Sequence, residues 1–286
     1  MITMALINRI QGMENELSKA ELRIFRYIKK NIDKIPTMTA EQIAKGSKTS
    51  APTVVRFAKK VGAASLTDFK IQISAENQSN VTNQEYSDVK KNEPIASLKE
   101  KLSQNAQLTL HETTQILSDE KLLAALKLLE TKERIFVTGV GASHLVAEDI
   151  KQKWDRIGKS VSLETNYNTL LPQLINTKKD AVLWLISNSG ETPEIIYFAE
   201  IAKELKIPII TLTRFGTNRL SKLADVSLQV SRPQEADQRS AATNSLIAQF
   251  LAVDILFYSY ISRNQENAEK IYQSRQIIKD FREKHF

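Results

Sequence analysis

Residues 181–205 read AVLWLISNSGETPEIIYFAEIAKEL, and this stretch decides the fold. The apolar run at 181–187 predicts a short strand, because it is rich in residues that favour strands and a polar turn bounds it. The turn ends before Pro193, which is well tolerated in the first turn of a helix and marks the start of a predicted helix at 193–205. The stretch therefore predicts one strand–loop–helix unit.

The same alternation repeats along the C-terminal two-thirds of the chain. Short β-branched-rich runs predict further strands at 134–140, 160–165, 207–213 and 225–231. Helical stretches lie between or after them at 142–156, 168–176 and 240–262, helical patterns at 95–117 and 119–131 precede them, and a charged helical tail covers 265–286. Alternation at this spacing favours a parallel, doubly wound sheet of the α/β class.

Before this region every pattern is helical. Residues 17–32 place apolar side chains on one face, and Ser18 with Glu21 has the form of a capping box. Thr39 with Gln42 is a second capping box, and it opens a short helix that ends at the polar turn KGSKTS. A further helix at 51–61, with Ser50 as its predicted N-cap, carries Val54, Phe57, Ala58 and Val61 at helical spacing.

A break in composition separates the two regions. Only four of the twenty residues at 74–93 are apolar, and they follow no period. Such a stretch buries too little surface to offset its ordering entropy, so it predicts a linker. The length of 286 residues also exceeds the roughly 150 residues of one typical domain. We therefore expect an all-α domain at 1–77, a polar linker at 78–93 and an α/β domain at 94–286.

The charge is concentrated in the first of these domains. The chain carries a net +7, of which residues 1–77 hold +6, with 13 Lys/Arg against 7 Asp/Glu. A small basic domain beside a nearly neutral one indicates a polyanionic partner such as nucleic acid. The alternative is a basic surface that only meets solvent.

Composition excludes several function classes. The chain has no Cys, which removes disulfides, thiolate metal sites and a cysteine nucleophile. Its three His are too scattered to predict a metal site, and Gly139-Val140-Gly141 lacks the third glycine of a dinucleotide fingerprint, so no cofactor is expected. No apolar run approaches the ~20 residues of a membrane helix, and charge comes too early for a signal peptide. These features predict a soluble, cytoplasmic protein.

A short helix, a turn and a second helix with exposed basic and hydroxyl residues have the form of a helix-turn-helix. The second helix would enter the major groove N-terminus first, with Arg56 placed for a bidentate guanine contact and Lys59 and Lys60 for phosphate. The candidate DNA contacts are Thr39, Lys48, Ser50, Thr53, Arg56, Lys59 and Lys60. A three-helix module that binds protein is the alternative.

Residues 18–70 resemble the N-terminal domain of the RpiR family of bacterial transcription regulators. The resemblance rests on SKAELRIFRYIKKN, TAEQIAK, TSAPTVVRFAKKVG and DFK, and the string from Ser50 to Phe57 is its most specific part. The resemblance implies that this string belongs to the recognition helix.

The turn Ser187-Asn188-Ser189-Gly190-Glu191-Thr192 is a candidate phosphate loop. Hydroxyls, a glycine and a helix N-terminus meet where a strand ends, and parallel sheets place ligands at that edge. A polar turn with a good N-cap is the alternative.

Residues 134–262 resemble the sugar isomerase (SIS) domain, which binds phosphosugars. The resemblance implies phosphosugar contacts at Ser143, Ser187, Asn188, Ser189, Gly190 and Thr192, and sugar contacts at Glu235 and Arg239 in EADQRSAATNS (235–245). Together the two resemblances imply a regulator, a dimer or dimer of dimers on a palindromic operator, controlled by a phosphosugar. The alternative is a phosphosugar isomerase or related lyase, with His144 and Glu235 as acid–base groups.

Overall fold

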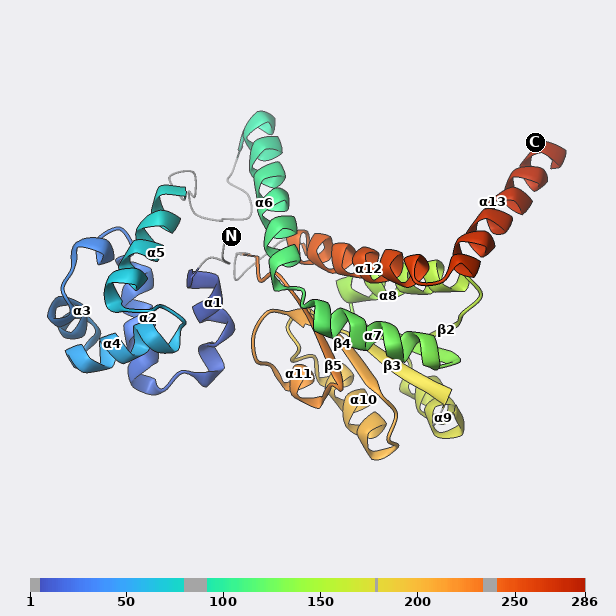
Figure 1. Ribbon diagram of the computed structural model, residues 1–286, viewed down its shortest axis with the longest axis horizontal. Helices are drawn as coiled ribbons and strands as arrows, with labels where there is room; N and C mark the ends of the chain where they lie inside the picture. The colour runs from blue at the N-terminus through green and yellow to red at the C-terminus, as the bar shows by residue number, and fades with distance from the viewer. Residues whose placement is uncertain (1–5, 80–91, 178–179, 234–240, 286) are drawn as a thin grey trace. The chain divides into compact units, whose positions relative to one another are not determined.

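The structure is a computed structural model that describes residues 6–79, 92–177, 180–233 and 241–285. The chain forms two compact units (Figure 1). One runs to Asn92, and the other holds the described residues from Glu93 on, apart from the loop Phe215–Thr217. Residues 80–91 of the predicted linker lie outside the described residues, so the predicted domain boundaries stay predictions.

The first unit is all-helical. Its helices are α1 (Leu6–Gly12), α2 (Lys19–Lys30), α3 (Ala40–Ser47), α4 (Ala51–Lys60) and α5 (Leu66–Ser79). Both predicted capping boxes are present, at Ser18 with Glu21 and at Thr39 with Gln42. Helices α1 and α5 were not predicted, and α5 continues two residues past the predicted domain end at 77, since a helical hydrogen-bond ladder does not stop where composition changes.

The apolar stripe predicted on α4 forms part of the core of this unit. Val54, Phe57 and Ala58 are buried, and the Phe57 ring meets Phe69 of α5 edge to face at 6.1 Å. Burying this face fixes which side of α4 meets solvent. Arg56 and Lys59 lie on the exposed side.

The second unit is built on a five-stranded, wholly parallel sheet. Its strands are β1 (Arg134–Gly139), β2 (Ser160–Leu163), β3 (Ala181–Ile186), β4 (Ile209–Arg214) and β5 (Val226–Val230), in the order β2-β1-β3-β4-β5. The helices are α6 (Ile95–Ile116), α7 (Asp119–Thr131), α8 (Ala142–Asp155), α9 (Tyr167–Thr177), α10 (Pro193–Glu204), α11 (Arg219–Leu223), α12 (Asn244–Ser262) and α13 (Gln265–His285). The predicted α/β class is confirmed; the five-residue α11 was not predicted.

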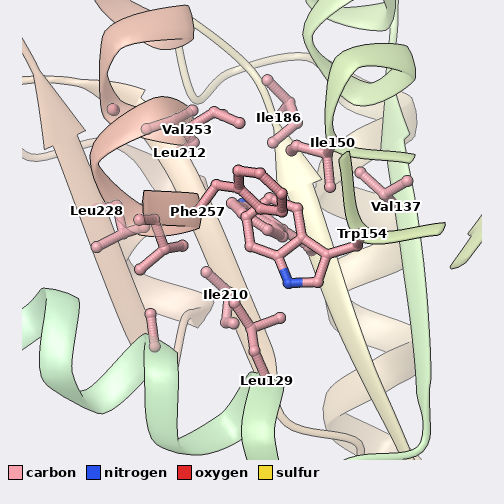
Figure 2. Packing of buried hydrophobic residues seen from close by; sticks show 14 of the residues in the cluster. Leu129, Val137, Ile150, Trp154, Ile186, Ile210, Leu212, Leu228, Val253 and Phe257 are labelled. Carbon is pink, nitrogen blue, oxygen red and sulfur yellow. The ribbon is translucent and has the colours of Figure 1, made fainter. Parts of the chain in front are cut away.

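Helices cover both faces of the sheet. Apolar side chains of α7, α8 and α12 pack on one face, and those of α9, α10 and α11 pack on the other. Trp154 of α8 anchors the first layer, with ring centroids 5.3 Å from Trp184 of β3 and 5.0 Å from Phe257 of α12 (Figure 2). Strand β3 is buried along its whole length, as a central strand covered on both faces should be.

One helix among the described residues, α12, has the length and apolar composition of a membrane span, which the sequence was not expected to hold. Its side chains Ala248, Ala252, Val253 and Leu256 belong to the core that covers the sheet. That packing accounts for its composition as a core helix of the α/β unit.

Candidate functional site

The strand order makes two neighbouring connections diverge at one edge of the sheet. The chain leaves β1 for α8 on one face and leaves β3 for α10 on the other, so the connections diverge between these neighbouring strands. Gly139 pairs with Ile186, which makes the two strands end level. Open parallel sheets bind ligands where connections diverge in this way. The loops after β1 and β3 therefore flank the expected ligand position.

The loop after β3 is closed by its own hydroxyl groups. Ser187 Oγ lies 2.9 Å from Thr192 Oγ1 and accepts a hydrogen bond of 3.2 Å from Gly190 N–H. Ser189 Oγ accepts one of 3.1 Å from Glu191 N–H. The predicted phosphate loop is thus a formed turn, with three hydroxyls brought together on six residues.

Neighbouring backbone holds this loop from outside. Asn188 C=O accepts from Arg214 N–H at 2.9 Å, and Gly190 C=O accepts from Leu220 N–H at 3.0 Å. Gly190 has φ +67°, and a Cβ there would lie 2.0 Å from Asn218 Oδ1. A side chain at position 190 is therefore excluded by both backbone conformation and space.

Helix α10 begins directly from the loop. Thr192 occupies its N-cap, and Pro193 opens the first turn. The Thr192 hydroxyl does not cap the helix but faces Ser187 across the loop. The first N–H groups of a helix and its dipole favour an anion. The loop hydroxyls and the N-terminus of α10 would therefore bind the same phosphate group.

Asn188 contributes a buried polar atom to the same loop. Its Oδ1 is buried and has no hydrogen-bond partner within the described part of the chain. Such an acceptor fits a hydroxyl donor, and the amide turned over would offer N–H to phosphate. Either orientation suits a phosphorylated sugar.

The loop after β1 is tight because Gly139 has little room. A Cβ on Gly139 would lie 2.6 Å from the Ser143 carbonyl oxygen, so α8 packs directly on the strand end. Ser143 is buried in the first turn of α8. His144 follows it, with Nε2 3.4 Å from Glu148 Oε1 and a buried Nδ1 that has no partner among the described residues.

Two predicted sugar contacts lie outside the described residues, namely Glu235 and Arg239. Sequence reasoning missed Asn244, which is buried at the start of α12 with Oδ1 unpartnered in the described structure. Helix α12 follows β5 and so starts at the edge that carries the phosphate loop. The place of Asn244 at the start of the helix that follows the last strand was the signal in the sequence that could have identified it.

The helix-turn-helix of the first unit consists of α3, the turn at 48–50 and α4. Lys48 ends α3 in the left-handed conformation, with φ 54°, and Thr49 N–H donates back to Ala44 C=O at 2.9 Å. Ser50 occupies the N-cap of α4, but its hydroxyl lies 2.7 Å from Thr53 Oγ1 and does not cap the backbone. Two hydroxyls and one cation therefore gather at the N-terminus of α4.

Two candidate DNA contacts, Thr39 and Lys60, have side chains that already hold partners within the first unit. The Thr39 hydroxyl accepts a hydrogen bond from Gln42 N–H in the capping box. Lys60 Nζ donates to Glu21 Oε2 at 2.9 Å and to Glu16 C=O at 3.1 Å, and its phosphate contact stays a prediction. Burial opposes ionisation of Glu21, but hydrogen bonds from Lys60 and Ser18 outweigh it and hold its pKa below the usual value. Lys60 thus ties α4 to α2.

Comparisons with known proteins agree with this two-part structure. The rpiR-family helix-turn-helix domain matches residues 4–80, and the SIS domain matches residues 127–259. An uncharacterized HTH-type transcriptional regulator of Bacillus subtilis (strain 168), YbbH, is 34% identical over 257 residues, which are 90% of each chain.

Solved structures share the fold at lower identity. The Vibrio vulnificus NanR protein complexed with ManNAc-6P has a TM-score of 0.62 at 23% identity, over 96% of this chain and 98% of that one. E. coli CFT073 c3406 in complex with A5P has a TM-score of 0.56 at 21% identity, over 65% of this chain and 100% of that one. The chain belongs to the RpiR family of HTH-type transcriptional regulators, with an N-terminal helix-turn-helix and a C-terminal SIS domain.

Proposed function

We propose that the chain binds operator DNA through α4 and that a phosphosugar bound between the β1 and β3 loops controls this binding. The observation that carries the proposal is the Ser187–Thr192 loop, where hydroxyls and the α10 N-terminus converge at the sheet edge. NanR and c3406 are complexed with ManNAc-6P and A5P, respectively, which supports the same ligand class here.

On the DNA side, the exposed face of α4 supplies the contacts. Arg56 is the candidate for a bidentate guanine contact, and Lys59, Lys48, Ser50 and Thr53 suit phosphate or base edges. A single helix reads only a few base pairs, so a dimer on a palindrome follows, with half-sites about 34 Å or a multiple apart. Binding to the bacterial chromosome places the protein in the cytoplasm.

Exposed apolar side chains support self-association. Ile95 of α6, Ile277 and Phe281 of α13 and Tyr258 of α12 are each more than half exposed. Exposed apolar side chains are typical of interfaces, and homo-oligomers are the usual outcome. A dimer, or a dimer of dimers, is the assembly we propose.

We propose further that the SIS domain performs no chemistry on the sugar. The His144–Glu148 pair of α8, next to the loop after β1, is the one observation that favours an isomerase, since it offers an acid–base group near the proposed site. Two measurements separate the functions: anisotropy with DNA from upstream of its own gene, and product analysis after incubation with hexose, pentose and N-acetylamino sugar phosphates. DNA binding without turnover supports the regulator, and turnover without DNA binding supports the isomerase.

A further inference from the structure

Helix α6 is attached to the α/β unit by polar groups. Its buried side chains are Thr109, Glu112 and Thr113, whereas every buried side chain of α7 is apolar. The larger apolar side chains Ile95 and Leu102 on α6 are exposed. Figure 1 shows the N-terminal half of α6 extending away from the sheet. Specific hydrogen bonds therefore help to set where this helix sits, together with its packing on α12 and β5.

Ser231, the residue after β5, makes these bonds. Its hydroxyl donates to Glu112 Oε2 at 2.6 Å, and its N–H donates to Thr113 Oγ1 at 3.3 Å. Ser231 and Thr113 are fully buried, and Glu112 is 5% exposed. A buried carboxylate that loses a donor is costly to keep in place, so this contact favours one position of α6 over others.

The same contact connects α6 to the phosphate loop through neighbouring strands of the sheet. Asn188 C=O accepts from Arg214 N–H at the end of β4. Arg214 pairs with Val230 at the end of β5, and Ser231 comes next in the chain. The phosphate loop and Ser231 are thus joined through two adjacent strand ends.

Helix α6 would amplify any movement at its docked end. Seventeen residues separate Glu112 from Ile95, which is about 25 Å of helix at 1.5 Å per residue. A tilt of about 10° at the docked end would move the far end by about 4 Å over that length. The far end of α6, at Ile95, is the end that follows the DNA-binding unit in the sequence.

We infer that Glu112 is a positioning residue, and that its hydrogen bond with Ser231 both anchors α6 and carries the response of the phosphosugar loop to it. The signalling part rests on the proposed function. The anchoring part does not, because it concerns the ligand-free chain.

The test is hydrogen exchange of the full chain, with and without the best-binding sugar phosphate, combined with calorimetry and DNA titration. The variants are Ser231→Ala, which removes the donor, and Glu112→Gln, which keeps an acceptor. Thr114→Ala is the control, because that exposed hydroxyl donates to His111 C=O in its own helix and away from Ser231. Thermal unfolding verifies that each variant folds, and Thr113→Val replaces any that does not.

For Ser231→Ala we expect amides at 100–113 to exchange at least about tenfold faster without ligand. Sugar affinity should stay within about threefold, while the effect of sugar on DNA affinity should fall below about twofold, since only the coupling is lost. Glu112→Gln should keep part of the coupling between sugar and DNA, because its amide oxygen still accepts from Ser231. Thr114→Ala should match the parent. Unchanged ligand-free exchange in Ser231→Ala overturns the anchor. Faster exchange with full coupling overturns the signalling role.

Failure of the proposed function gives a different result. If no sugar phosphate binds the parent chain, the hydrogen exchange without ligand still tests whether Ser231 anchors α6. The signalling part of the inference is then refuted together with the proposed function.

Discussion

Removing two loop hydroxyls should weaken phosphosugar binding by two decades or more. In Ser189→Ala/Thr192→Val the loop keeps its backbone and the β-branched shape at its N-cap, but it loses two donors at the phosphate position. Hydrogen bonds to a charged group are worth about 1.5–3 kcal/mol each when lost. Two of them amount to about 3–6 kcal/mol, which raises Kd roughly 10²- to 10⁴-fold at 1.4 kcal/mol per decade.

The fold should survive this double change. Ser189 Oγ accepts from an exposed N–H, which water can satisfy in its absence. Thr192 Oγ1 bonds the buried Ser187, whose Oγ keeps its bond from Gly190 N–H. Losing one such neutral hydrogen bond costs about 0.5–1.5 kcal/mol, against a typical stability of 5–15 kcal/mol.

Calorimetry with a panel of sugar phosphates and their unphosphorylated parents measures the effect. Ser262→Ala, at the far end of α12, is the control for a lost hydroxyl in the same domain. DNA affinity without ligand should remain at the parent value. The reasoning is refuted if the double variant binds the phosphosugar as tightly as the parent, or if the unphosphorylated sugar binds the parent equally well.

Four further predictions concern single features. Arg56→Ala should cost about 1–3 kcal/mol in operator binding by loss of a base contact. Lys59→Ala should weaken binding to all DNA sequences alike and flatten its salt dependence. Equal losses of affinity for operator and random DNA in Arg56→Ala would mean that Arg56 is only a phosphate contact. Lys48→Gly should raise the thermal midpoint, because a left-handed residue other than glycine costs about 1–2 kcal/mol, yet weaken DNA binding in an anisotropy titration; a lower midpoint would contradict the first part. Gly190→Ala should destabilise the SIS domain in thermal unfolding by the clash with Asn218, and an unchanged midpoint would mean that the loop relaxes freely. Limited proteolysis should cut first within 74–93 and leave a fragment starting near residue 94, and a first cut inside 134–262 would disprove the predicted boundary.

Local signals were predictable from the sequence. The capping boxes at Ser18 and Thr39 depend on residues three positions apart, and the buried stripe of α4 depends on helical spacing. Strand–helix alternation was enough for the α/β class, because each strand carried its own apolar run. The short helices α1 and α11 escaped prediction, since five to seven residues give too little periodicity.

Contacts between distant residues were not predictable. The bond from Lys60 to Glu21 spans 39 positions, and the one from Ser231 to Glu112 spans 119. Both depend on how helices pack, which no local pattern records. The same holds for Arg214, whose N–H supports the phosphate loop from the neighbouring strand.

The most direct test of the account is reciprocal linkage between the two ligands. Operator affinity is measured by anisotropy with and without saturating sugar phosphate, and sugar affinity by calorimetry with and without operator DNA. The account predicts that each ligand changes the affinity for the other by the same factor, about 5- to 150-fold. Operator affinity that stays the same at saturating sugar phosphate would contradict it.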